Sequence, residues 1–190
     1  WTNVATATSV SLSGLSLSDG SKYYASVKAT DKADNVSAVK TGDGITIDLT
    51  APIIGTVNDG IEDDINATTS TTTLSANWTG FSDATSGIAN YEYAIGSFSG
   101  GTDTKDWVSN GLDSTVTATG LSLTYTNTYF MSIRATDLVG NVSTVATSNG
   151  VVVDIYPGPP SITAASIESN STLPVLTNTK VSFTISEPVT

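Results

Sequence analysis

The sequence predicts an all-β protein built from tandem β-sandwich domains, and three observations lead to this prediction. Apolar residues alternate with polar ones in short runs, which is the pattern of half-buried strands. Turn-forming clusters such as NDG, SDATSG and SNG separate these runs. The chain also repeats itself, because Trp1 aligns with Trp107 and, at the same offset, Tyr23 aligns with Tyr129. No stretch keeps an apolar period of 3.6 residues, so we expect essentially no helix.

The repeat predicts how the chain is divided into domains. The stretch YYASVKATDKADNVS in the first copy corresponds to YFMSIRATDLVGNVS in the second, without a gap. A period of about 100 residues corresponds to a whole sandwich domain rather than a solenoid unit. We therefore expect residues 1–50 to be the C-terminal half of one domain, 51–156 to be a complete domain, and 157–190 to begin a further one. The chain is then a segment of a longer array, and residues 1–50 need strands from another segment to close a core.

Alternation assigns the faces of the predicted strands in chain order, starting with TTTLSANW and continuing through YEYAI, YFMSIRAT and VVVD. One face of each strand carries the larger apolar side chains and the other is mainly small or polar. The side chains expected to point outward are Glu92, Ala94, Ser132 and Arg134. Those expected to share the inner face are Leu74, Ala76, Trp78, Tyr91, Tyr93, Ile95, Tyr129, Met131, Ile133, Ala135, Val151 and Val153.

These stretches resemble the fibronectin type III-like repeats of bacterial secreted and cell-surface proteins, and the resemblance covers residues 1–156. It implies tandem Ig-like or fibronectin type III-like β-sandwiches, with Trp78 as a core tryptophan. It also implies that Leu121 and Tyr129 form a corner in which the tyrosine hydroxyl bonds to nearby backbone. Leu15 and Tyr23 match this pair in the first copy. The last part, NTKVSFTISEPVT, resembles the start of a different bacterial Ig-like domain.

Composition excludes several classes of function. The net charge is −11 and there is no cysteine or histidine. Clustered basic residues are needed for nucleic acid, so we expect no nucleic-acid partner. No apolar run is long enough to span a bilayer, so we expect no membrane insertion. Catalytic triads based on histidine are excluded, and most aspartates lie in turns, so we expect no enzymatic activity.

The acidic turns suggest calcium at the domain joints. In this topology the end of one domain approaches two loops of the next, so Asp48 is expected near Asp83, Asp137 and Asn141. Oxygen ligands from several segments are what Ca²⁺ prefers. Asp154 occupies the equivalent place after the second domain, near the acidic stretch NDGIEDDIN. The alternative is that these acids only form solvated turns, because their spacing is not that of an EF-hand loop.

Two further features have competing interpretations. The prolines of LTAP and YPGPP either limit bending between domains or simply mark the start of a strand. Exposed Trp1, Trp107 and Phe98 would be able to stack on sugars, but the repetition of the two tryptophans favours core or edge positions.

We therefore expect a structural stalk or spacer segment of a large extracellular bacterial surface protein, such as an adhesin. Its partners would be neighbouring domains of the same chain, and distal domains would mediate cell adhesion through surface glycans, a host or a substratum. The alternative is an accessory spacer or carbohydrate-binding module array of a secreted multidomain enzyme.

Overall fold

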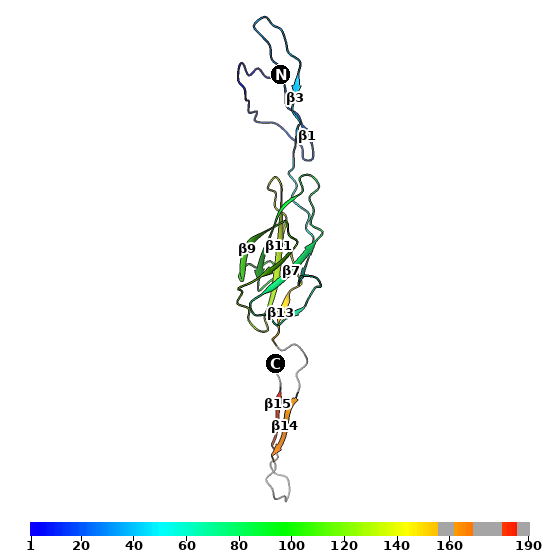
Figure 1. Cartoon of the computed structure of the whole chain (residues 1–190), viewed down its shortest axis with the longest axis vertical. Helices are drawn as coiled ribbons and strands as arrows, with labels where there is room; N and C mark the ends of the chain where they lie inside the picture. Colours follow the sequence, from blue (N-terminus) through cyan, green and yellow to red (C-terminus); the bar gives the residue numbers. More distant parts are fainter. Residues whose placement is uncertain (156–161, 169–179, 186–190) are drawn as a thin grey trace, which may run out of the picture.

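The computed structural model describes residues 1–155, 162–168 and 180–185, and these residues form an all-β structure without helices. The strands lie in several separate sheets (Figure 1). Their bounds are β1 Lys22–Tyr23, β2 Ser26–Val27, β3 Lys40–Thr41, β4 Ile45–Thr46, β5 Thr56–Asp59, β6 Ala67–Thr68, β7 Leu74–Thr79, β8 Ile88–Gly96, β9 Lys105–Gly111, β10 Thr115–Ala118, β11 Thr128–Asp137, β12 Ala146–Thr147, β13 Val151–Val153, β14 Ile162–Glu168 and β15 Lys180–Ile185.

Residues 51–155, here called the central unit, contain two sheets. One has the order β10-β7-β5, and the other has the order β6-β13-β11-β8-β9, with β12 also paired to β11. All pairs are antiparallel except β13 with β6, which are parallel. Because the strands that pair come from distant parts of this stretch, the central unit closes only when the whole of it is present.

The two sheets share one hydrophobic core. Trp78 of β7 is buried and meets the ring of Tyr91 edge-on, with centroids 5.6 Å apart. All of the side chains predicted to face inward are buried, except Tyr91, which is partly buried against the core. The alternation rule therefore identifies the inner face correctly, because each of these strands buries that face against the opposite sheet.

Ala94 and Ser132, which alternation places on the outer face, are nevertheless fully buried. They lie opposite each other on β8 and β11, and Ser132 also lies opposite Thr147 of β12. The alternation of residues along each strand assigns these two side chains to the correct face. It does not predict that this part of the outer face is buried.

Residues 1–50, here called the N-terminal repeat, reproduce the pairing of β11 with β12 and β13. Lys22 pairs with Thr46 as Thr128 pairs with Val152, and Ser26 pairs with Thr41 as Ser132 pairs with Thr147. The isolated bridges Thr30–Val36 and Thr136–Val142 also correspond. The sequence repeat is therefore a structural repeat with the same register.

The tyrosine hydrogen bond implied by the resemblance is present in both copies. The Tyr129 hydroxyl accepts the Thr124 backbone N–H at 3.0 Å, and the Tyr23 hydroxyl accepts the Ser18 N–H at 3.0 Å. The two copies differ in burial, however. Leu15 is 58% exposed whereas its counterpart Leu121 is buried, and Val27 is 61% exposed whereas its counterpart Ile133 is fully buried.

The N-terminal repeat, the central unit and the β14–β15 hairpin follow one another along the longest axis of the molecule (Figure 1). β14 and β15 pair antiparallel. The further Ig-like domain expected over 157–190 lies largely outside the described residues.

Candidate functional site

The loop between β11 and β12 is organised by one aspartate. Asp137 Oδ1 accepts the backbone N–H groups of Val139, Gly140 and Asn141 at 2.9, 2.7 and 2.9 Å. Its Oδ2 accepts the Asn141 side-chain amide at 2.7 Å. Gly140 has a φ of 100°, a conformation that favours glycine. The sequence TDLVGN therefore folds around the Asp137 carboxylate.

A second aspartate organises the loop between β7 and β8 in the same way. Asp83 Oδ1 accepts the backbone N–H groups of Thr85, Ser86 and Gly87 at 3.1, 2.8 and 2.9 Å. Every hydrogen bond that the described residues donate to this carboxylate reaches Oδ1. Its other oxygen is therefore available to a ligand.

The last three residues of the N-terminal repeat, 48–50, contact the Asp137 loop; we call these residues the connecting segment and their contact with the loop the joint. The Asn141 amide nitrogen lies 3.4 Å from the Asp48 carbonyl oxygen and 3.3 Å from the Thr50 carbonyl oxygen, and it donates to both. Asp48 itself is only 8% exposed. Asn141 thus connects the central unit to the connecting segment as a hydrogen-bond donor.

The joint brings three predicted acids together. One carboxylate oxygen from each of Asp48, Asp83 and Asp137 lies within 4.8 Å of the others. Asp48 Oδ1 accepts the Thr50 N–H at 3.1 Å, whereas Asp48 Oδ2 is buried and accepts no hydrogen bond from the residues that the structure describes. The cluster therefore combines a buried carboxylate oxygen that lacks a partner with two carboxylates fixed by their loops.

Hydrogen bonds favour the ionised form of two of these acids. The N–H groups of Gly87 and Ser86 lower the pKa of Asp83, although burial and the Asp137 charge act in the opposite direction. Burial also raises the pKa of Asp137, but the bonds from Asn141, Val139 and Gly140 outweigh it and leave that pKa below its ordinary value. At neutral pH the joint therefore concentrates negative charge, and in the described part of the chain its acids pair with no lysine or arginine.

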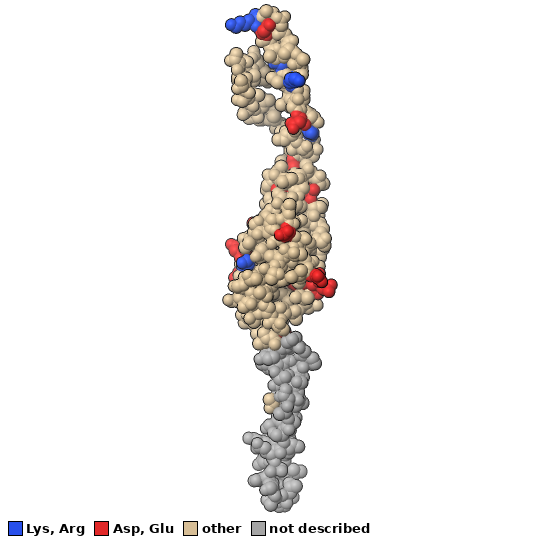
Figure 2. All heavy atoms as spheres, viewed as in Figure 1, with Lys and Arg blue, Asp and Glu red and all other residues tan. Residues whose placement is uncertain are grey.

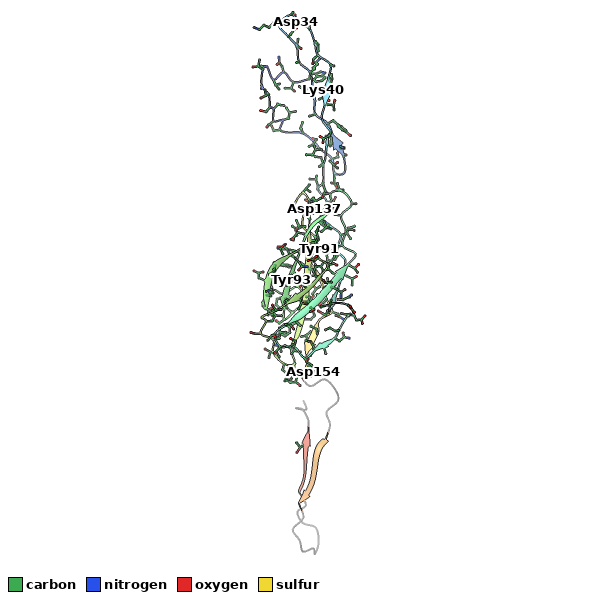
Figure 3. All side chains as sticks on the ribbon, viewed as in Figure 1. Asp34, Lys40, Tyr91, Tyr93, Asp137 and Asp154 are labelled. Atoms are coloured by element: carbon green, nitrogen blue, oxygen red, sulfur yellow. The ribbon has the colours of Figure 1, made fainter. Side chains whose placement is uncertain are left out.

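Asp154, the fifth predicted ligand, does not join this cluster. Figure 3 places it at the end of the central unit opposite Asp137. Its backbone N–H donates to the Thr68 carbonyl at 2.8 Å. Its expected partners belong to 157–190 and lie largely outside the described residues.

A different acid at that opposite end is fully buried. Asp59 Oδ2 accepts the Gly150 N–H at 3.0 Å, and Asp59 Oδ1 has no partner. Burial raises the pKa of Asp59 to about 6, despite hydrogen bonds from Ser148 and Gly150. Asp64 accepts the Asp59 N–H at 3.0 Å, and its charge raises this pKa further. Asp59 therefore links the end of β5 to the turn before β13 at an electrostatic cost.

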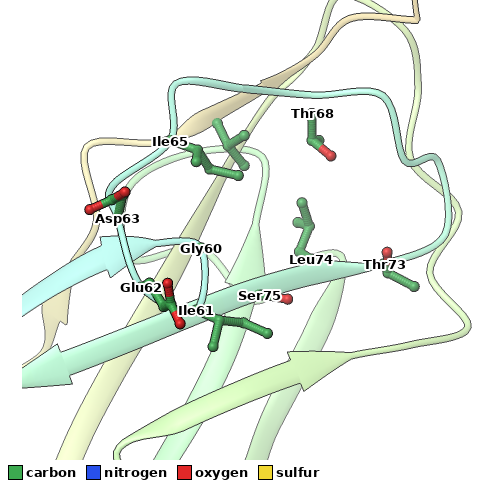
Figure 4. Close-up of a pocket in the computed structure, with 10 residues that line it drawn as sticks. Gly60, Ile61, Glu62, Asp63, Ile65, Thr68, Thr73, Leu74 and Ser75 are labelled. Carbon is green, nitrogen blue, oxygen red and sulfur yellow. The ribbon is translucent and has the colours of Figure 1, made fainter.

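A shallow depression lies beside Asp59, between the loop after β5 and strand β7 (Figure 4). Ile65 and Leu74 contribute apolar surface to it. Its two acids, Glu62 and Asp63, are exposed residues of the loop. The rest of its polar lining consists of the hydroxyl groups of Thr68, Thr73 and Ser75, and the chain has no histidine or cysteine that would activate them.

The outer face of the larger sheet carries a basic side chain stacked on a tryptophan. The Arg134 guanidinium lies 4.3 Å from the centroid of the Trp107 ring and forms an ion pair with Glu92 at 2.8 Å. In the N-terminal repeat, Lys28 covers Trp1 in the same relation at 4.8 Å. Trp107 lies on the edge strand β9, as one of the two interpretations predicts, and one face of its ring is occupied by Arg134.

Surface charge agrees with the composition. In Figure 2 acidic residues are scattered over the visible face, and the basic residues form no patch on the central unit. None of the described residues form a helix that is long and apolar enough to cross a membrane.

Two groups that form hydrogen bonds at or beside the joint were not among the site residues predicted from the sequence. The carbonyl oxygen of Thr50 accepts the Asn141 amide, and the Asp19 carboxylate accepts the Leu49 N–H at 2.7 Å and the Thr50 hydroxyl. A backbone carbonyl leaves no residue-type signal. Asp19 lies in a turn, SDG, whose composition is explained equally well by turn formation.

Comparisons with known proteins do not identify this chain. No protein-family model matches it, and no curated protein sequence is significantly similar to it.

Proposed function

We propose that this chain is a non-catalytic spacer segment of a large extracellular bacterial surface protein, in which fibronectin type III-like β-sandwiches follow one another as a stalk. The observation that carries this proposal is the joint. Asn141 of the central unit donates to the carbonyl oxygens of Asp48 and Thr50, which belong to the connecting segment. Such bonds restrict the direction in which one repeat leaves the next.

The identical strand register of the two repeats supports a serial architecture. The N-terminal repeat has the hairpin of the central unit but exposes the residues that the central unit buries, such as Val27 against Ile133. A segment with the pattern of residues 51–106 would cover this face. We therefore interpret residues 1–50 as the C-terminal half of a domain whose other half is supplied by a further segment.

The joint is tested by small-angle X-ray scattering of the full chain, with Asn141→Ala as the variant and Asn35→Ala as its matched control. Asn35 makes the same local bond to Asp31, at 2.9 Å, but lies in the other copy of the loop and does not touch the joint. We expect an extended particle for the wild type, greater flexibility for Asn141→Ala, and no change for Asn35→Ala. A compact particle for the wild type contradicts the spacer function.

Exposure at the cell surface is tested separately. Antibodies against the central unit should label intact cells of the source organism, and labelling only after lysis contradicts an extracellular location. The alternative of a carbohydrate-binding module is less well supported, because Arg134 occupies one face of the Trp107 ring that a sugar would stack on.

A further inference from the structure

We propose that the joint between the N-terminal repeat and the central unit is a binding site for Ca²⁺, with Asp48, Asp83 and Asp137 as carboxylate ligands. The proposal depends on the geometry of these residues, so it holds or fails independently of the spacer function. It assigns a chemical role to the meeting of three carboxylates, two of which also organise their own loops.

The first argument is the number and type of oxygen atoms. Three carboxylates from three segments each place one oxygen within 4.8 Å of the other two. Ca²⁺ accepts six to eight oxygen ligands at about 2.3–2.6 Å and tolerates irregular geometry. Carboxylate oxygens that surround a cation at such distances lie close to one another, and water would complete the coordination.

The second argument is an oxygen atom to which no described residue donates a hydrogen bond. Asp48 is more than nine-tenths buried, and its Oδ2 accepts no hydrogen bond. A buried carboxylate oxygen without a partner is strongly unfavourable. Asp48 belongs to the cluster, so a cation between the three carboxylates removes this cost.

The third argument is that the loops present their carboxylates in a fixed position. The backbone N–H groups of 85–87 hold Asp83 Oδ1, and those of 139–141 hold Asp137 Oδ1. Each carboxylate therefore has little rotational freedom to lose on binding. Asp48 lies on the connecting segment, so a cation bound by all three joins the two repeats.

The N-terminal repeat contains the same loop without the cluster. Asp31 Oδ1 accepts the N–H groups of Ala33 and Asn35 at 2.8 and 2.9 Å, as Asp137 does in its own loop. Asp31 is exposed, and in the described part of the chain no further acids gather around it. Both repeats therefore contain this loop, but only the loop of Asp137 has Asp48 and Asp83 beside its carboxylate.

The experiment is a titration of the full, EGTA-treated chain with CaCl₂, followed by ¹⁵N–¹H NMR and thermal unfolding. We expect the amide signals of Gly87 and Gly140 to shift, and Tm to rise by several degrees above about 1 mM Ca²⁺. Asp48→Asn should lose both responses. Asp63→Asn, which removes the same charge from an exposed loop, should retain them.

Two further measurements decide the interpretation. Asp83→Asn keeps an oxygen that accepts the loop N–H groups, so it should fold normally yet bind Ca²⁺ at least tenfold more weakly. If Asp48→Asn is unstable in EGTA, the Asp83 variant provides the test instead. Absence of any shift in the wild type, or an unchanged response in Asp48→Asn and Asp83→Asn, overturns the site. An equal response to Mg²⁺ overturns its assignment to Ca²⁺.

Extended scattering without Ca²⁺ binding would contradict this site and leave the spacer function standing. Ca²⁺ binding to a compact particle would support this site and contradict the spacer function.

Discussion

At the scale of single residues, aspartates in this chain perform opposite electrostatic roles. Backbone N–H groups lower the pKa of Asp83, so its ionised form stabilises the fold. Asp59 is fully buried, and burial raises its pKa to about 6, so its ionised form destabilises the fold. The residue type is the same in both cases. The pKa falls where hydrogen-bond donors outweigh burial, and it rises where burial outweighs the donors.

Asp59 gives the stability of the protein a defined dependence on pH. Its pKa is raised from 3.8 to about 6 on folding, so the folded state binds this proton more tightly than the unfolded state. The contribution of Asp59 is fully present below its unfolded pKa and is lost as pH rises through about 6. Asp59→Asn should remove this loss.

The measurement is the free energy of unfolding in urea from pH 4 to pH 7, for the wild type and the variant. The difference between the two should grow in favour of Asp59→Asn as pH rises across this range. Acids whose pKa is lowered, such as Asp83 and Asp137, lose their stabilising contribution as pH falls. Because this loss is the same in both proteins, it does not affect the difference between their free energies of unfolding. A difference independent of pH would contradict the assigned ionisation.

The corner tyrosines provide a matched pair of hydrogen bonds. Tyr129→Phe removes the acceptor of the Thr124 N–H and should reduce the free energy of unfolding by about 1 kcal/mol. Tyr23→Phe removes the equivalent bond to Ser18, which is exposed, so its effect should be smaller. Denaturant unfolding of the two variants measures both values, and an equal loss would show that burial does not matter here.

At the scale of the strands, close approach of two backbone segments restricts one position near the start of β5. A Cβ atom on Gly55 would lie 1.9 Å from the Thr79 carbonyl oxygen and 2.7 Å from the Phe81 nitrogen. Both neighbours are backbone atoms, which cannot rotate away. Gly55 therefore permits β5 to pack alongside the end of β7.

Gly55→Ala should be strongly destabilising, by about 3 kcal/mol, because backbone has to move to accommodate the methyl group. The matched control is Gly100→Ala, where a Cβ meets nothing within 4 Å and only the positive φ of 79° opposes substitution. That cost should be about 1–2 kcal/mol. Thermal and urea unfolding of both variants test the ranking, and equal losses would contradict the close approach at β5.

At the scale of the whole molecule, the hydrophobic core lies within a single stretch of the chain. Its buried members extend from Val57 to Val153, and both sheets of the central unit contribute to them. The N-terminal repeat contains the same hairpin, yet Trp1 is 76% exposed and Tyr24 58% exposed. Independent stability is therefore expected of the central unit and not of the N-terminal repeat.

A fragment of residues 53–156 should unfold in a single cooperative transition as a monomer. A fragment of residues 1–50 should show no cooperative transition, because a two-stranded hairpin without a covered face is marginally stable in water. Calorimetry and analytical ultracentrifugation check both expectations. Failure of the larger fragment to melt cooperatively would show that the domain boundary is wrong.

The sequence by itself determined the all-β class, the repeat and the inner face of each strand. These features follow from local alternation and turn chemistry, which act over a few residues. The corner hydrogen bonds of Tyr23 and Tyr129, in which the donor lies five residues away, were implied by the family resemblance and not by alternation or turn chemistry. The sequence also indicated which acids should meet at the joint, from the expected order of strands and loops.

Only the tertiary structure decided which acids are buried and which oxygens lack a partner. Asp59 and the exposed Asp63 lie in the same acidic stretch, yet long-range packing excludes water from Asp59 Oδ1, as it does from Asp48 Oδ2. The burial of Ala94 and Ser132 has the same origin, because the rows of a sheet join residues far apart in the chain. Burial depends on neighbours brought together by folding, and no local pattern contains them.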